Sequence, residues 1–231
     1  MQPSSSSSPA PIRVERIACG INNCFLLSQG GSAILVDTAV KSSRKKILAR
    51  CAGMNVTLIL LTHGHYDHAQ NAAWLAERLG VPIAMHPADI PLLGDILREP
   101  LLPTDFTSCM LIAILKLARK PGLRWAQGLM GMEIPPFAPA IALREGFSLA
   151  KYGVEATVIE LPGHSPGSVG VAAGKDLLAG DAVTNLFAPG KAALYTDRAA
   201  MEASAEKIAA YGTEMTVHFG HGKSMGNRAR W

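Results

Sequence analysis

The sequence predicts an α/β fold, and two neighbouring segments carry that prediction. Residues 56–61 form an apolar run with the length and composition of a buried strand. Downstream, apolar residues recur at the spacing of one helix face and stop before Gly80 and Pro82, at positions Ala72, Leu75, Ala76 and Leu79. With 231 residues and 48% hydrophobic content, the chain is long enough to bury a substantial core.

The N-terminal elements are expected to be short antiparallel strands followed by a helix. Residues 13–19, 24–28 and 32–37 are predicted strands, because glycines at 20, 30 and 31 separate them. Ser42 or Ser43 can cap a helix that ends at Gly53 and turns Ile47, Leu48 and Cys51 inward. After the strand at 56–61, we expect a helix over about 67–79 and a strand over 82–85.

The C-terminal half repeats the alternation of strands and helices. Strands are expected at 155–160, 168–172, 176–179 and 215–219. A helix over about 197–210 precedes the last of them and turns inward Met201, Ala205 and Ile208.

Residues 1–11 are expected to form a disordered tail, since they are rich in serine and proline and contain no apolar segment. Residues 12–231 are expected to form one domain. No secretion signal is evident, and the cysteines lack metal-site spacing and fall in apolar runs, at Cys19, Cys24, Cys51 and Cys109. This pattern predicts buried thiols in a cytoplasmic protein, with a Cys19–Cys24 disulfide as the alternative.

The segment 62–68 places three histidines and a carboxylate within six residues, directly after the strand at 56–61. His63 and His65 are two apart, so on extended chain their imidazoles point the same way and can converge on one cation. Asp67 and His68 lie where the chain turns into a helix, so they can hold a second cation beside the first. The segment therefore predicts a pair of metal sites at a strand-to-helix junction.

The motif His-Gly-His-Tyr-Asp-His resembles the signature of the metallo-β-lactamase superfamily, and four further motifs of that family follow its order. They are Asp37-Thr38 after a strand, the Pro-Gly-His turn that ends at His164, Gly180-Asp181, and Gly220-His221-Gly222. The five motifs together span residues 37–222, which makes a chance match improbable. The resemblance implies a four-layer αβ/βα sandwich with the metals at one rim between its two sheets.

The resemblance also implies a role for each motif residue. The first cation would be held by His63, His65 and His164, the second by Asp67, His68 and His221, and Asp181 would bridge them. Asp67 and Asp181 are the expected catalytic carboxylates, and Asp37 and Thr38 would support the histidine loop by hydrogen bonds. His86 and His218 match no ligand position and are expected to be structural. His221 is preferred to His218 because flanking glycines allow a tight turn.

These ligands suit two divalent cations, of which Zn²⁺ is the first expectation and Fe²⁺ or Mn²⁺ are alternatives. Two such cations would make a bridging hydroxide available at neutral pH, and the predicted enzyme is a hydrolase of an ester, thioester, lactone or similar bond. The complete ligand set resembles the glyoxalase II, lactonase and phosphodiesterase branches of the family. Open alternatives are a phosphodiesterase, a weak β-lactamase, a non-catalytic binder, and an iron-dependent persulfide dioxygenase using His63, His164 and Asp181.

The long interval between His68 and His164 predicts a helical insertion over about 96–140. Residues 106–132 hold four basic residues and no acid, so their charge equals the net charge of +4 and leaves the rest neutral, which argues against a nucleic-acid surface. The apolar runs are also too short to span a bilayer. The insertion is expected to be an α-hairpin that adds core, forms a homodimer contact, docks on a membrane surface, or caps the metals.

As a cap, the hairpin would form a pocket for a small-molecule substrate with an apolar portion. The side chains expected to line that pocket are Met110, Leu115, Trp125, Met130 and Lys223. Lys223 follows a ligand turn and could meet an anionic substrate group; an exposed solubilising lysine is the alternative.

Overall fold

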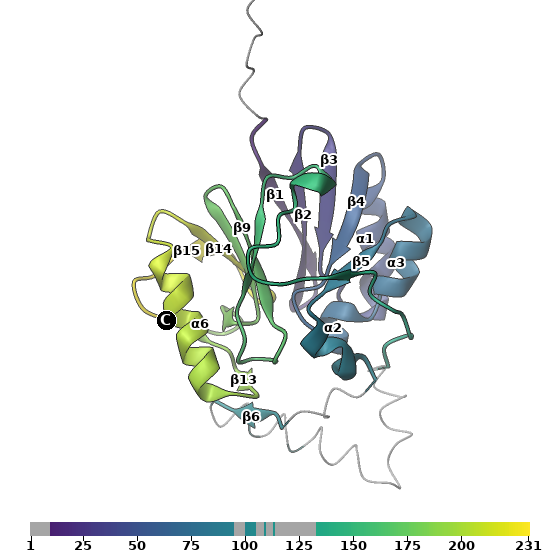
Figure 1. Cartoon of the computed structure of the whole chain (residues 1–231). Coiled ribbons are helices and arrows are strands. Elements are labelled where there is room, and N and C mark those ends of the chain that lie inside the picture. Colours follow the sequence, from purple (N-terminus) through teal and green to yellow (C-terminus); the bar gives the residue numbers. More distant parts are fainter. Residues whose placement is uncertain (1–9, 95–99, 105–108, 110–112, 114–132) are drawn as a thin grey trace, which may run out of the picture.

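The computed structural model of the chain describes residues 10–94, 100–104, 109, 113 and 133–231 (Figure 1). Residues 1–9 of the predicted tail lie outside this range, as does most of the predicted hairpin at 106–132. The predicted pocket residues Met110, Leu115, Trp125 and Met130 are outside it too. Within the described residues, no helix is both long enough and apolar enough to cross a membrane.

Six strands form the first sheet, in the order β1-β2-β3-β4-β5-β7. Strands β1, β2 and β3 form an antiparallel meander, and β4, β5 and β7 then add in parallel. Glycines with positive φ close the two hairpins, at Gly20, Gly30 and Gly31. The strands are β1 (Arg13–Cys19), β2 (Asn22–Gln29), β3 (Ser32–Val36), β4 (Asn55–Leu60), β5 (Ile83–Met85) and β7 (Ile141–Ala142).

Five strands form the second sheet, in the order β15-β14-β10-β9-β8. They are β8 (Thr157–Glu160), β9 (Val169–Ala173), β10 (Asp176–Gly180), β14 (Thr216–Phe219) and β15 (Met225–Gly226). Only β10 and β14 pair in parallel, which is why helix α6 (Arg198–Ala210) must cross between them. Two small ribbons pair β11 (Val183–Thr184) with β12 (Gly190–Lys191), and β6 (Leu102–Pro103) with β13 (Leu194–Tyr195).

Three hydrophobic clusters separate four layers, as expected (Figure 1). Helices α1 (Arg44–Cys51) and α3 (Ala72–Leu79) cover the outer face of the first sheet through Ile47 and Leu75. The two sheets meet through side chains such as Leu60 and Val171. Helix α6 covers the outer face of the second sheet through Ile208 and its neighbours. Short 3₁₀ segments complete the chain as η1 (Lys41–Ser43), η2 (Pro87–Leu93) and η4 (Ala150–Tyr152).

The single helix predicted over 67–79 is wrong, because the structure divides it into α2 (Tyr66–Ala69) and α3. Asn71 causes the break: its side-chain amide donates to the carbonyls of Thr38, Ala39 and Val40 instead of pointing to solvent. The residues between the two helices therefore fasten the histidine segment to the loop after β3.

The prediction for the cysteines is partly wrong. Cys19, Cys24 and Cys51 are buried free thiols, whereas Cys109 is exposed. Of the three residues predicted to face inward on α1, Leu48 is only partly buried, while Ile47 and Cys51 are fully buried.

The alternative Cys19–Cys24 disulfide is absent. Ile17, and not Cys19, faces Cys24 across the hairpin, so the two sulfurs are on diagonal positions of the ladder.

Candidate metal centre

All seven predicted ligands lie on segments that follow strands, at one edge of the two sheets. His63 and His65 follow β4, and Asp67 and His68 belong to α2 immediately after them. His164 follows β8, Asp181 follows β10 and His221 follows β14, so the second sheet contributes the remaining three. Parallel strands present their carboxyl ends at the same edge, which is how residues far apart in sequence meet here.

The three-histidine cluster, His63, His65 and His164, is buried, and its potential ligand atoms lie within 4.8 Å of one another. Nε2 of His164 is 2.9 Å from Nδ1 of His65. The outer nitrogens are oriented by oxygen atoms: Thr62 Oγ1 is 3.1 Å from His63 Nδ1, and the Leu194 carbonyl is 2.8 Å from His164 Nδ1. These bonds fix the ring orientations of His63 and His164.

The carboxylate cluster, Asp67, His68 and His221, lies beside it and is less buried. Nε2 of His68 and Nε2 of His221 are 3.5 Å apart and face Asp67, whose Oδ2 is 3.9 and 3.4 Å from them. Asn22 donates to the same carboxylate oxygen at 2.9 Å, and the Ile21 carbonyl accepts from His221 Nδ1 at 3.1 Å. The turn between β1 and β2 therefore supports this cluster.

Asp181 lies between the two clusters. Its Oδ2 is 3.7 Å from Nε2 of His164 on one side, and 3.6 and 3.2 Å from Nε2 of His68 and His221 on the other. The carboxylate can lie here because the backbone at Gly220 passes close to it. A Cβ at Gly220 would come within 2.1 Å of Asp181 Oδ1 and 2.6 Å of His68. Glycine is required at 220 for the carboxylate to occupy this place.

The residues of the two clusters are chemically suited to bind a pair of cations, because several of their buried nitrogen and oxygen atoms have no hydrogen-bond partner. Among the described residues, the buried side-chain atoms without a hydrogen-bond partner are His63 Nε2, His65 Nε2 and Asp181 Oδ1. Buried polar atoms without partners are rare and costly, and these three belong to the predicted ligand set. Imidazole nitrogens and carboxylate oxygens together suit zinc, iron or manganese.

The two clusters differ in charge. Burial, followed by the neighbouring imidazoles, holds the pKa of His63 well below its usual range and lowers the pKa of His65 to about 3. Burial also opposes charge on His68 and His221. The surrounding carboxylates, Asp181 foremost, nevertheless raise the pKa of His68 well above its usual range and that of His221 to about 10. Burial therefore disfavours a proton on His63 and His65, whereas the carboxylates favour protons on His68 and His221.

Asp37 holds the histidine segment by hydrogen bonds, as expected. Its carboxylate accepts from the Thr62 amide and hydroxyl, both at 2.8 Å, and is 2.9 Å from His68 Nδ1. The Thr38 hydroxyl donates to the His68 carbonyl at 2.6 Å. Asp37 adopts φ of 61°, a left-handed conformation that non-glycine residues rarely occupy, and these bonds maintain it.

Asp89 was missed by the sequence analysis, although it joins the two loops of the three-histidine cluster. It is fully buried on η2, where Oδ2 accepts from the Gly64 amide at 2.9 Å and the Ser165 hydroxyl at 2.6 Å. Its Oδ1 accepts from the Gly167 amide at 2.6 Å. No periodicity marks this aspartate; the sequence signals are Gly64, beside the first two histidines, and Gly167, three residues after His164, since a Cβ at either glycine would collide with Asp89.

The other polar residues singled out from the sequence lie apart from the clusters. His86 Nε2 is 3.2 Å from Glu160, and His218 is 2.7 Å from Asp176 and 2.8 Å from Ser224. Neither histidine belongs to the metal-competent groups found among the described residues. Lys223 is exposed, and its carbonyl accepts from the Asn185 side chain at 2.7 Å.

The family model described as the metallo-beta-lactamase superfamily matches residues 17–221, most of the chain. The chain belongs to this superfamily. Members of the superfamily are mostly metal-dependent hydrolases, and the motif order and four-layer architecture described above agree with the assignment.

Two proteins similar in sequence and one solved structure illustrate the similarity. An uncharacterised Mycobacterium leprae protein is 29% identical over 217 residues, covering 87% of each chain. A hydroxyacylglutathione hydrolase from Anaeromyxobacter dehalogenans is 38% identical over 68 residues, covering 29% of this chain and 26% of its own. The crystal structure of TTHA1623 in a di-iron-bound form is 27% identical with a TM-score of 0.64, covering 93% of this chain and 94% of that one.

Other relatives are longer than the region they share with this chain. An Aquifex aeolicus protein is 28% identical over 147 residues, which cover 56% of its length, and related Mycobacterium tuberculosis proteins are covered over 59%. The similarity therefore establishes the superfamily and its fold, and the specific activity is a separate question.

Proposed function

We propose that this protein is a dinuclear metal-dependent hydrolase that cleaves an ester, thioester or lactone bond. The observation that carries the proposal is Asp181, whose Oδ2 lies within 3.7 Å of ligand nitrogens in both clusters while its Oδ1 is buried without a partner. One carboxylate shared by two ligand groups is the arrangement that two neighbouring cations require.

Two bound cations would supply a hydroxide nucleophile at neutral pH and polarise the carbonyl under attack. The protein's own residues would fix where that chemistry occurs. The pKa values of His63 and His65 are lowered by burial, so these two imidazoles can bind a cation at neutral pH without first losing protons. Asp67, held by Asn22 and accessible on one side, is placed to accept a proton from the attacking group and pass it on.

The substrate class is supported by the segment similar to hydroxyacylglutathione hydrolase, a thioester hydrolase by name, over 68 residues. Zinc and iron are the two metals with specific support, and manganese is the third candidate. Zinc suits the nitrogen-rich three-histidine cluster, and the di-iron form of TTHA1623, at 27% identity, supports iron. All three metals are therefore included in the test.

The test is metal analysis and turnover of the full-length chain loaded with zinc, iron or manganese. We expect close to two cations per chain and turnover of an ester, a thioester or a lactone; turnover of phosphodiesters alone would indicate the phosphodiesterase alternative. In Asp181→Ala, we expect the occupancy of both positions to fall and kcat/KM to drop on the order of 10³-fold, since several kcal/mol of transition-state stabilisation is lost. Lys175→Gln, an exposed change in the turn after β9, is the matched control.

Two results would contradict the proposal. One cation per chain with full activity in Asp181→Ala would exclude a dinuclear mechanism. Absence of turnover with every substrate class and every metal would favour a binder that kept the fold. Oxygen consumption with a persulfide by the iron-loaded chain alone would instead indicate the dioxygenase alternative.

A further inference from the structure

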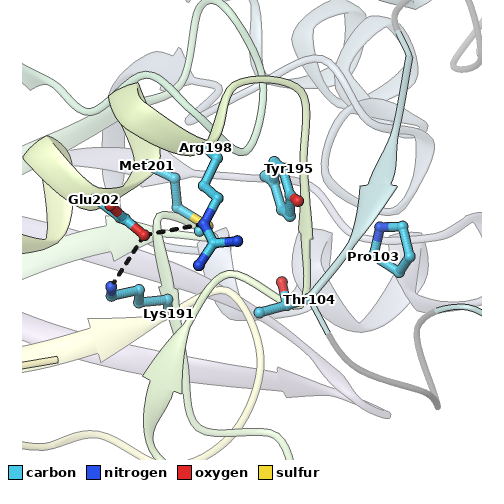
Figure 2. A pocket seen from close by; sticks show the side chains of 7 residues that line it. All are labelled: Pro103, Thr104, Lys191, Tyr195, Arg198, Met201 and Glu202. Atoms are coloured by element: carbon cyan, nitrogen blue, oxygen red, sulfur yellow. Dashed lines mark hydrogen bonds and ion pairs between the residues drawn. The ribbon is translucent and has the colours of Figure 1, made fainter.

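Figure 2 shows the lining of a recess of about 210 Å³. The recess lies beside the segment that carries His164, because Gly163 contacts Met201 and Thr196. Its lining comes from the β6–β13 ribbon, from β12 and from the first turns of α6. The residues that line it are Pro103, Thr104, Lys191, Tyr195, Arg198, Met201 and Glu202. Of these, only Tyr195 is marked by the sequence, as a residue that could replace the tyrosine that lactonases carry three residues after the bridging aspartate, where this chain has Thr184.

The recess is joined to the metal centre through the backbone. Leu194, next to Tyr195, accepts from His164 Nδ1 at 2.8 Å. The Gly163 carbonyl accepts from Thr196 N at 2.7 Å, and a Cβ at Gly163 would collide with Met201. The same turn therefore holds a predicted metal ligand on one side and forms the wall of the recess on the other.

The recess carries an excess of positive charge. Glu202 faces both Arg198 Nε at 3.1 Å and Lys191 Nζ at 3.7 Å, so one carboxylate offsets two cations (Figure 2). Within the described part of the chain, Arg198 bonds only Glu202, through Nε, which leaves its terminal N–H groups available. A guanidinium with free terminal N–H groups matches the two oxygens of a carboxylate or phosphate group.

The remaining walls favour a small anion attached to a larger molecule. Met201 is buried at the base, and Pro103 adds an apolar side. Thr104 is fixed to the opposite loop by bonds to the carbonyls of Ala192 and Ala193, and Tyr195 adds a hydroxyl. The volume suits a group of a few heavy atoms and is below that of a whole-ligand pocket.

We propose that this recess is an anion subsite, which binds a carboxylate or phosphate group on the substrate whose acyl bond lies at the metal centre. The proposal rests on the proposed hydrolase function for the identity of the reaction, and on the recess alone for anion binding. It narrows the substrate class to acyl compounds that also carry an oxyanion group.

The kinetic test compares three thioesters on the metal-loaded full-length chain: one with a carboxylate on the leaving thiol, its neutral carboxamide, and its phosphate counterpart. Arg198→Gln and Lys191→Gln should each raise KM about tenfold for the charged compounds and leave kcat unchanged. The neutral compound should be unaffected. Glu202→Gln should lower KM for charged compounds only, because it removes the competing acid. Lys175→Gln is the control.

The phosphate and carboxylate arms decide which oxyanion the subsite prefers. Equal KM changes for charged and neutral thioesters, or no change in either Arg198→Gln or Lys191→Gln, would overturn the proposal. A raised KM for charged compounds in Glu202→Gln would also contradict it. Thermal unfolding of each variant confirms that it folds.

A binding test separates this proposal from the hydrolase proposal. The zinc-loaded chain is titrated with acetate and with inorganic phosphate while the backbone amide signals of Thr104 and Tyr195 are followed by NMR. We expect saturable shifts in the native chain and their loss in Arg198→Gln. If no thioester is turned over but these shifts occur, the hydrolase proposal fails and the subsite stands. Absent or Arg198-independent shifts overturn the subsite.

Discussion

The two halves of the metal centre are held in shape by different means. The three-histidine cluster, in which burial disfavours protons on His63 and His65, is supported from outside by Asp89, which joins both histidine loops. The carboxylate cluster holds itself together, because Asp67 and Asp181 lie 3.4 and 3.2 Å from His221 and raise its pKa. Substitution of a ligand, substitution of Asp89 and a change of pH should therefore each affect the two clusters differently.

Ligand substitutions should give the largest contrast. In His164→Ala, the buried three-histidine cluster loses a ligand that solvent is poorly placed to replace, and kcat/KM should fall on the order of 10³-fold. In His221→Ala, water can reach the less buried carboxylate cluster and take the lost position, so the fall should be about 10–100-fold. Metal content and kinetics of both purified variants measure this. Equal loss of cations and activity in the two variants would remove the distinction between the clusters.

Disrupting the hydrogen bonds of Asp89 should have the next largest effect. Both oxygens of Asp89 face only donors, so the amide of Asp89→Asn must turn its NH₂ group toward an N–H of Gly64 or Gly167. We expect about 10–100-fold weaker binding of one cation and a loss of about 1–3 kcal/mol in the free energy of unfolding.

The matched variant for this test is Asn22→Ala, which removes the amide that bonds Asp67. It should weaken the other cation and leave the three-histidine cluster intact. Competition with a chelating dye resolves the two affinities. Lower stability of Asp89→Asn with both affinities unchanged would show that Asp89 supports the fold and not the centre.

The smallest expected effect is a pH dependence of metal-free stability with two limbs. The pKa of His65 is lowered from 6.5 to about 3 by burial, so protonation favours unfolding and stability is lost as the pH falls from about 6.5 toward 3. The pKa of His221 is raised from 6.5 to about 10, so its contribution is complete below about 6.5 and is lost as the pH rises toward 10.

Thermal unfolding between pH 4.5 and 9.5, with and without added zinc, measures both limbs. Zinc should raise Tm more at alkaline pH, where the imidazoles no longer need protons removed before they bind. His221→Ala should weaken the alkaline limb and keep the acidic one. An unchanged alkaline limb in that variant would assign it to another group.

The sequence predicted which seven residues gather at this edge, because each lies in a short motif that resembles the superfamily pattern; that they bind metal stays a prediction. Most strands and α6 were also predicted, to within a few residues at their ends. Asp89 and the recess beside α6 could not be, since their partners are distant: Asp89 meets Gly167, and Thr104 meets Ala192, through contacts that no local pattern records. The break between α2 and α3 was missed because Asn71 bonds three carbonyls of a loop about thirty residues earlier.

The bond between Asn23 and the Gly222 carbonyl joins residues 199 positions apart, and Asn22 bridges His221 in the same place. This contact fixes the order in which the centre can be assembled during synthesis. The ribosome must have added residue 221, and β14 must have docked beside β10, before the carboxylate cluster exists. His65 and His164, whose rings approach to 2.9 Å, are both synthesised before residue 221. A chain stalled before β14 therefore contains every residue of the three-histidine cluster and lacks His221, which completes the carboxylate cluster.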